Sequence, residues 1–275
     1  MSPEQLAATV DLADGHSARV YSTGEGEPLL LLHGWSLDRR SFAPQRDALA
    51  GRYRVLTFDR RGFGESTAPP DLNRELDDID RILDSLGIER VHLLGVSQAA
   101  RLALRYAVLR PARLCSLLVQ GVVIDGYSPD ASAGQDLPLA HYQALARGGD
   151  LDTLRKEWLA HPMMSAGIED PAQRALLARI VADYRALDLT SEAPPIAPPA
   201  IDVLAGLPTL SLPILVLTGE LETPARKAHA GELVRLAPRA REVMLPGAGH
   251  LSNLAAAPAY NQAVLDFLEG AGGDD

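Results

Sequence analysis

The sequence contains a single cysteine, Cys115, and only 5% aromatic residues among its 275 positions. One cysteine excludes an intramolecular disulfide and a cysteine-rich zinc site. Long apolar runs are also missing, because the longest aliphatic block, residues 29–32, is far too short to cross a bilayer. The first 15 residues lack the basic and apolar segments of a secretion signal. These absences predict a soluble cytoplasmic protein.

Basic side chains are fewer than acidic ones, 26 against 36, which gives a net charge of −10. Nucleic acids and anionic membranes attract basic surfaces, so neither is expected as a partner. We instead expect a small-molecule substrate and water, and the sequence predicts no particular oligomeric state. With 47% apolar residues, the chain has the composition of a globular protein with a sizeable core.

The first 125 residues alternate short apolar runs with helical patterns, which predicts an α/β fold with a mostly parallel central sheet and helices on both faces. The pair Asp14-Gly15 predicts the turn of an N-terminal hairpin at the sheet edge. Apolar residues recur at three- and four-residue steps from Asp71 to Leu86 and predict a helix that ends at Gly87. The expected strands cover residues 9–13, 18–22, 28–32, 54–58, 90–94, 114–121, 213–217 and 243–245, and a further helix covers 99–109.

Helical patterns replace strand patterns between about residues 127 and 207, with helices expected within 141–146, 151–159 and 171–187. A Pro/Ala-rich stretch at 193–200 is typical of a rigid connector. We therefore predict an α/β core formed by residues 1–126 and 208–275. Residues 127–207 are predicted to be inserted as a helical lid over the carboxyl ends of the strands, where α/β folds bind ligands.

One short motif places a serine between a strand and a helix. The residues Gly95, Val96, Ser97, Gln98 and Ala99 follow the strand at 90–94. In this context a sharp turn raises the serine hydroxyl above the sheet, and small residues around it let strand and helix approach closely. Ala99 stands where the usual pattern has a second glycine. Ser97 is the candidate nucleophile.

A nucleophilic serine needs a histidine as base and a carboxylate that orients the histidine. His250 follows the strand at 243–245, and Glu222 follows the strand at 213–217. The order serine, acid, histidine is the one that this strand-turn-helix motif predicts. Asp125 is a rival acid, since it follows the strand at 114–121. The chain order favours Glu222.

Five landmarks in sequence order make the chain similar to members of the α/β-hydrolase fold family. Residues 33–35, HisGlyTrp, resemble the family's oxyanion loop, and residues 59–66 resemble its D-x-R-G-x-G-x-S turn. The serine motif at 95–99, GlyGluLeuGlu at 219–222 and GlyAlaGlyHisLeu at 247–251 complete the set. The resemblance runs from residue 28 to the C-terminus, and the predicted lid carries no family signature.

The resemblance implies acyl transfer through a covalent acyl-enzyme on Ser97, with His250 as general base and then general acid. It also implies an oxyanion hole formed by the backbone N–H groups of Gln98 and Trp35. This chemistry requires no metal and no organic cofactor. The candidates for contacts with substrate are His33, Gly34, Tyr142, Trp158, Met163 and Met164.

The turn at 59–66 is interpreted as structural, because no phosphate-loop pattern with its lysine is present. Arg60 and Arg61 are expected at the surface or in ion pairs. His33 is expected to order the oxyanion loop without ionising.

The leading hypothesis is a serine hydrolase that cleaves a small or medium carboxylic ester, or a lactone or thioester. The short lid and the few aromatic residues favour substrates of this size. Ser97 argues against the family's haloalkane dehalogenases and epoxide hydrolases, which resemble this chain but carry Asp at this position. C–C bond hydrolases and cofactor-free perhydrolases share the three residues and stay open as alternatives, and the fold cannot separate them. A ligand-binding protein without catalysis is a further alternative, although that role gives no reason to keep the three residues in order.

Overall fold

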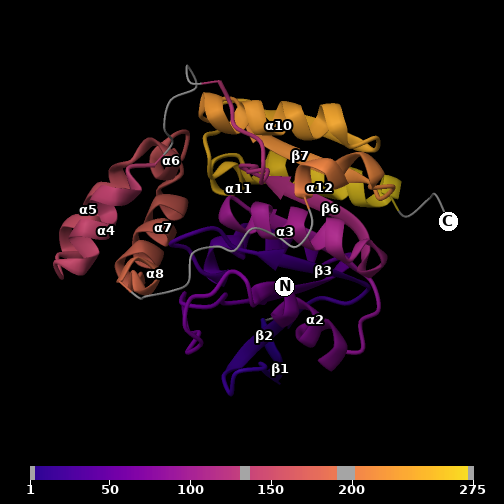
Figure 1. Cartoon of the computed structure of the whole chain (residues 1–275), viewed down its shortest axis with the longest axis horizontal. Coiled ribbons are helices and arrows are strands. Elements are labelled where there is room, and N and C mark those ends of the chain that lie inside the picture. The colour runs from indigo at the N-terminus through magenta and orange to yellow at the C-terminus, as the bar shows by residue number, and fades with distance from the viewer. Residues whose placement is uncertain (1–3, 131–136, 191–201, 272–275) are drawn as a thin grey trace.

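The computed structural model describes residues 4–130, 137–190 and 202–271, and an eight-stranded sheet lies at its centre (Figure 1). The strands are β1 (Gln5–Asp11), β2 (Ser17–Thr23), β3 (Glu27–Leu32), β4 (Tyr53–Phe58), β5 (Val91–Val96), β6 (Leu114–Gln120), β7 (Ile214–Gly219) and β8 (Ala240–Leu245). Their order across the sheet is β1-β2-β4-β3-β5-β6-β7-β8. The pairs from β4 to β8 are parallel, whereas β1 and β2 pair antiparallel at one edge. The predicted mostly parallel sheet and its edge hairpin are confirmed.

Both faces of the sheet are covered because the central strands are apolar along their whole length. In β3, Leu30 and Leu32 pack into one cluster and Leu29 and Leu31 into the other, as the alternation of side chains along a strand requires. The first cluster includes residues of α2 (Glu75–Ser85), α3 (Gln98–Leu109) and α10 (Pro224–Leu236). The second includes residues of α1 (Ala43–Leu49) and α12 (Ala257–Ala271).

The strand order reverses beside β3. The chain leaves β3 for β4 on one side and then returns to β5 on the other side of β3. The segments that follow β3 and β5 therefore leave the sheet next to each other, at the position where open α/β sheets bind ligands. This topology brings the loop at 33–35 to the serine motif at 95–99.

Local hydrogen bonds and a glycine set the ends of two helices that flank the sheet. Thr223 begins α10, because its Oγ1 accepts a hydrogen bond from the N–H of Arg226 at 3.3 Å, and Pro224 follows it. Gly87, with φ of 67°, follows α2 as predicted. The helix begins at Glu75 and not at Asp71, because Asp71 accepts backbone N–H groups in a turn just before it.

Most of the described segment between β6 and β7 is helical and lies at one end of the sheet (Figure 1). Its helices form a third apolar cluster with residues of the loops after β3, β4 and β8, among them Leu37, Phe63 and Leu251. The helices are α4 (Leu139–Arg147), α5 (Leu151–Ala160), α6 (Pro162–Ser165), α7 (Pro171–Asp183) and α8 (Leu187–Thr190). The division of the chain at residues 127 and 207 stays a prediction, and the connector predicted at 193–200 lies outside the described residues.

The last short helix of this segment packs differently from α4 to α8. Within α9 (Val203–Gly206) and the residue after it, Val203 and Leu207 join the sheet cluster that contains α3. Residues 203–207, which were predicted to belong to the lid, therefore contact the sheet layer. Among the described helices, none combines the length and the apolar character that a membrane crossing demands.

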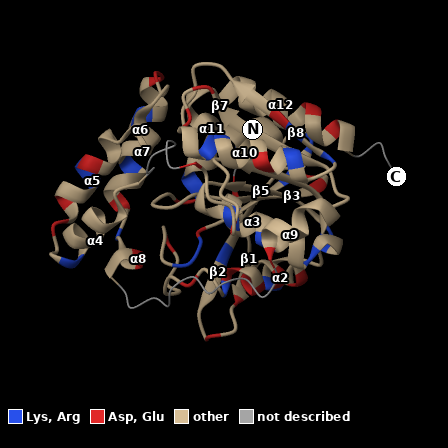
Figure 2. Ribbon diagram, turned by 45° about the horizontal axis from the view of Figure 1, so that its top comes forward, with Lys and Arg blue, Asp and Glu red and all other residues tan. Residues whose placement is uncertain are grey.

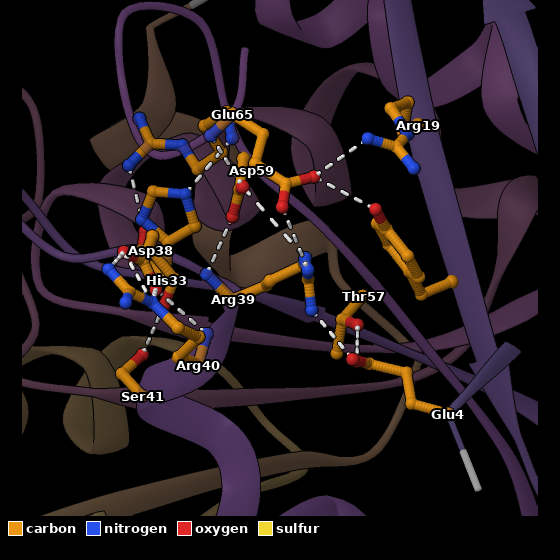
Figure 3. A network of polar contacts seen from close by, with 12 residues as sticks. Glu4, Arg19, His33, Asp38, Arg39, Arg40, Ser41, Thr57, Asp59 and Glu65 are labelled. Atoms are coloured by element: carbon orange, nitrogen blue, oxygen red, sulfur yellow. Dashed lines mark hydrogen bonds and ion pairs between the residues drawn. The ribbon is translucent and has the colours of Figure 1, made fainter. Parts of the chain in front are cut away.

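The turn after β4 is stabilised by buried charges. Asp59 accepts the backbone N–H groups of Arg39 and Glu65, both at 2.8 Å, and lies in a network that extends to Glu4 (Figure 3). Arg60 and Arg61 are both buried, so the expectation of surface positions is wrong, whereas the alternative expectation of ion pairs is confirmed. Arg60 pairs with Glu75 and Arg61 with Asp78 of α2.

Acidic and basic positions are interspersed along the ribbon (Figure 2). Several of them pair between neighbouring elements, as Arg110 does with Asp77 and Asp80 of α2. Exposed pairs of this kind contribute little stability, typically about 0–1 kcal/mol each. Removing one partner of the buried pairs of Arg60 and Arg61 would cost more, because it would leave a buried charge without its counterion.

Candidate active site

Ser97 lies in a strained turn between β5 and α3. Its φ of 57° and ψ of −113° are rare for a residue with a side chain. The turn is fixed on both sides, because the N–H of Ser97 donates to the carbonyl of Gln120 on β6 at 2.7 Å, and the Ser97 carbonyl accepts the N–H of Ala100 at 2.9 Å. Strain that the surrounding structure maintains in this way is typical of functional sites.

Two glycines let the backbone approach closely around Ser97: Gly95 on β5 and Gly34 in the loop after β3. A Cβ on Gly95 would lie 2.4 Å from the carbonyl oxygen of Ala99, so strand and helix require glycine there. Ala99 itself is fully buried, and its methyl group is accommodated where the usual pattern has glycine. A Cβ on Gly34 would lie 3.4 Å from Cβ of Ser97, which shows that the loop after β3 packs against the serine turn.

His250 and Glu222 meet at the ends of β8 and β7. The Nδ1 atom of His250 lies 2.6 Å from Oε2 of Glu222, and both side chains are buried. The second carboxylate oxygen of Glu222 accepts the N–H of Thr223 at 2.8 Å. With Nδ1–H donating to the carboxylate, Nε2 is the basic atom of the imidazole, which is the tautomer that a general base requires.

Two neighbours fix the position of His250. A Cβ on Gly121, just after β6, would lie 2.4 Å from Cε1 of the imidazole, so the ring rests against the glycine backbone. The Gln120 amide donates to the His250 carbonyl at 2.7 Å and to Oδ1 of Asn253 at 3.1 Å. The end of β6 therefore holds both the ring and the backbone of His250.

Asp125, the rival acid, is engaged elsewhere. Its carboxylate accepts hydrogen bonds from Nε of Arg101 and of Arg105, each at 2.5 Å. Burial opposes ionisation of Asp125, but the hydrogen bonds and charges of Arg105 and Arg101 prevail and lower its pKa. Glu222, and not Asp125, is the carboxylate in contact with His250.

A cavity of about 500 Å³ lies in front of these residues. Ser97 and His250 both line it. Of the residues that the sequence suggested for the oxyanion hole and for substrate contacts, it is lined by Gly34, Trp35, Gln98, Trp158, Met163 and Met164. The described part of the helical segment between β6 and β7 thus supplies one wall of the cavity, and the serine and histidine loops supply another.

His33 and Tyr142 are not among the residues that line the cavity, and their role as substrate contacts stays a prediction. His33 is fully buried; its Nδ1–H donates to the Gly34 carbonyl at 2.9 Å, and its Nε2 accepts the N–H of Arg60 at 3.0 Å. Burial and the Arg60 charge lower the pKa of His33 to about 3, so it stays neutral and orders the loop. Tyr142 packs its ring against Trp158, with centroids 5.6 Å apart.

Some residues at the cavity were not anticipated. Asp188, Arg101 and Arg226 line it, and Asp188 accepts a hydrogen bond from the indole of Trp35. Arg60 also contacts the serine turn, where its guanidinium donates a hydrogen bond to the side chain of Gln98 at 3.1 Å. Arg60 lies within the landmark at 59–66, so the sequence motif could have identified it, whereas no local motif marks Asp188.

Comparisons with known proteins identify relatives of the chain. A family model described as "Alpha/beta hydrolase family" matches residues 29–263. The chain is 24% identical over 272 residues to an (E)-2-((N-methylformamido)methylene)succinate hydrolase from Acinetobacter baylyi, covering 96% of this chain and 98% of that one. It is 30% identical over 247 residues to a pimeloyl-[acyl-carrier protein] methyl ester esterase from Aeromonas hydrophila, covering 85% and 92%. An esterase structure from Exiguobacterium antarcticum superposes with a TM-score of 0.80 at 21% identity, covering 95% and 99%, which shows a shared fold.

Replacing the two acids separately tests which one serves His250. We expect Glu222→Gln to lower kcat by about 10⁴-fold, because an amide favours the wrong imidazole tautomer. Asp125→Asn is the matched control and should keep kcat near that of the unchanged protein while lowering the melting temperature, since Arg101 and Arg105 lose their carboxylate. Steady-state hydrolysis of a p-nitrophenyl ester measures both. Normal turnover in Glu222→Gln contradicts the assignment.

A pair of glycine variants tests whether the Gly121 backbone positions the imidazole. Gly121 and Gly87 have φ of 63° and 67°, so alanine at either position costs about 1–2 kcal/mol in backbone strain. Only at Gly121 would the new Cβ meet His250, because nothing lies within 4 Å of a Cβ at Gly87. We expect kcat to fall about 100-fold in Gly121→Ala, as for a catalytic group misplaced by about 1 Å, and to stay unchanged in Gly87→Ala. Equal kcat values for folded samples of both variants would refute this role.

Proposed function

The chain belongs to the alpha/beta hydrolase family, and from this premise we propose that it is a serine hydrolase that cleaves a small or medium carboxylic ester, with a lactone or thioester as close variants. The observation that carries the proposal is the buried contact of His250 with Glu222 at 2.6 Å, beside a cavity that Ser97 also lines. A strained serine, an oriented imidazole and a cavity are among the requirements of nucleophilic acyl transfer.

In the proposed mechanism, the Ser97 hydroxyl attacks the ester carbonyl while Nε2 of His250 takes its proton. The tetrahedral intermediate collapses, the C–O bond to the alcohol breaks, and His250 returns the proton to the leaving oxygen. Water then attacks the acyl-enzyme by the same route in reverse, which frees the acid and restores Ser97. Glu222 stabilises the imidazolium that forms in each half of the reaction.

The oxyanion is proposed to bind the backbone N–H groups of Gln98 and Trp35. Gln98 is the first residue of α3, and the N–H groups of a helix's first turn have no acceptor within the helix. The helix dipole also favours negative charge at this end. Trp35 belongs to the loop that packs against Ser97 through Gly34. Removing one such donor typically costs about 2.7–4 kcal/mol of transition-state stabilisation.

The size and lining of the cavity support a small or medium substrate. A volume of about 500 Å³ lies near the lower part of the range for small-molecule sites, about 300–1,000 Å³. Trp158, Met163 and Met164 give it an apolar wall, which suits the acyl or alcohol part of an ester. The 30% identity to an esterase of a methyl ester supports the same class of reaction. The proposed partners are this substrate and water.

The helical segment is proposed to act as the lid of this cavity. Residues of four of its described elements line the cavity, namely Leu139 and Gln143 of α4, Trp158 of α5, Met163 and Met164 of α6 and Asp188 and Leu189 of α8. A wall made by this segment excludes water from the site and sets the shape of the acyl pocket. The lid would therefore determine which esters fit.

A series of p-nitrophenyl esters with increasing acyl length tests the proposal. We expect the unchanged protein to show its highest kcat/KM with acetyl to hexanoyl esters, because the cavity of about 500 Å³ lies in the lower part of the range for small-molecule sites. Ser97→Ala is expected to lose turnover by about 10⁶-fold, the loss seen when a serine nucleophile is removed. A preference for long acyl chains would refute the predicted substrate size, and undiminished turnover in Ser97→Ala would refute the mechanism.

A further inference from the structure

Trp35 is tied to the helical segment by a hydrogen bond across the cavity wall. Its indole Nε1–H donates to Oδ2 of Asp188 on α8 at 2.5 Å. The other oxygen of the same carboxylate, Oδ1, accepts the hydroxyl of Tyr184 at 2.7 Å. Both oxygens of Asp188 therefore have a donor, and one of these donors comes from the loop after β3.

Ionised Asp188 is stable at this partly buried position only while Trp35 and Tyr184 donate hydrogen bonds to it. Burial raises the pKa of Asp188, while the hydrogen bonds from Tyr184 and Trp35 and the charge of Arg60 oppose the rise. A partly buried charge without hydrogen bonds would lose solvation that nothing replaces. The free energy of docking α8 is thus coupled to the position of the Trp35 indole.

The surroundings leave the indole little freedom. The Trp35 ring lies 4.8 Å from Trp158 and 5.8 Å from Tyr184, both in edge-to-face geometry. Trp158 in turn donates from its own indole to the Ser36 hydroxyl at 2.6 Å. Ser36 has φ of 60°, a conformation that costs energy for a residue with a side chain. Two indole hydrogen bonds therefore connect residues 35 and 36 to α8 and α5.

We propose that Asp188 is a positioning residue that sets the oxyanion hole through the Trp35 side chain. The inference rests on the proposed function, in which the Trp35 backbone N–H is one of the two oxyanion donors. Asp188 touches no reacting atom in this role. By binding the Trp35 indole, Asp188 fixes the orientation of Trp35, whose backbone N–H must point at the developing negative charge.

This arrangement links substrate enclosure to catalysis. The oxyanion donor on the loop after β3 is in place only while α8 is docked against that loop. The helical segment therefore acts on the transition state as well as on the shape of the cavity. Interactions that act on the transition state alone change kcat and leave KM unaltered.

The first test is Asp188→Asn, which keeps the volume of the side chain. The amide nitrogen cannot accept a hydrogen bond, so at least one of the two donors, Trp35 or Tyr184, loses its acceptor. We expect kcat for p-nitrophenyl esters to fall about 10- to 100-fold with little change in KM, a part of the 100- to 1,000-fold loss that follows removal of an oxyanion donor. The control is Asp183→Asn on α7, which contacts Arg40 and not Trp35 and should keep both constants.

A double-mutant cycle tests whether Asp188 acts through Trp35. Trp35→Phe removes the indole donor and should lower kcat to the same extent as Asp188→Asn. The fall in kcat of the double variant is then expected to equal that of the less active single variant, because the effects of contacting residues that act as one unit are not additive. Losses that multiply in the double variant would show that Asp188 acts by another route and would overturn the proposal.

Tryptophan fluorescence reports on the contact of Trp35 with Asp188 independently of activity. The chain has two tryptophans, so Trp158→Phe leaves Trp35 as the only tryptophan, whose emission is selected by excitation at wavelengths where tyrosine does not absorb. Adding Asp188→Asn to this variant should shift the Trp35 emission to the red as the ring loosens, and Asp183→Asn should not. If the unchanged protein turns over esters and Asp188→Asn alters neither kcat nor the emission, the positioning role is overturned and the proposed function stands. If the unchanged protein hydrolyses no ester, the proposed function falls and the positioning role falls with it.

Discussion

The guanidinium of Arg60 joins the segments that surround Ser97. It is fully buried and donates to Glu75 of α2 at 2.6 Å, to the His33 carbonyl at 2.8 Å and to the Gln98 side chain at 3.1 Å. One charged group thus connects α2, the loop after β3 and the first residue of α3. A rigid fork of five N–H groups allows arginine to make these contacts at once, and lysine could not. Because a buried charge must keep its partners, the positions of these three segments are coupled.

The histidine side of the site depends on close backbone approaches. Gly121 lets the imidazole rest on the end of β6, and a Cβ on Gly219 at the end of β7 would lie 2.3 Å from the Gly249 carbonyl. These contacts bring the ends of β6, β7 and β8 together around His250. Ser97, Glu222 and His250 follow β5, β7 and β8 of the parallel part of the sheet, and Asp188 of the helical segment contacts Trp35 of the loop after β3.

Much of this could be predicted from local sequence, because each central strand is an apolar run and each loop residue follows one. Ser97, His250 and Glu222 each lie just after a predicted strand, and α12 carries an apolar stripe with Tyr260, Val264 and Phe267 that a search for helical periodicity would have found. The helix α10 buries Ala225, His229, Ala230 and Leu233, and only Leu233 among them is a large apolar residue, so its apolar stripe is weak. The burial of Arg60 and Arg61 depends on partners on α2, and the contact of Asp188 with Trp35 spans 153 residues. No local pattern contains such information.

Covalent trapping of the nucleophile tests the central claim most directly. The protein is treated with a fluorophosphonate, and its intact mass and digested peptides are measured by mass spectrometry. A serine activated by His250 and Glu222 should take up one phosphonyl group, located on Ser97. The reaction should be absent in Ser97→Ala and strongly slowed in Glu222→Gln. A folded protein that takes up no phosphonyl group, or that is labelled equally in Ser97→Ala, would contradict the account.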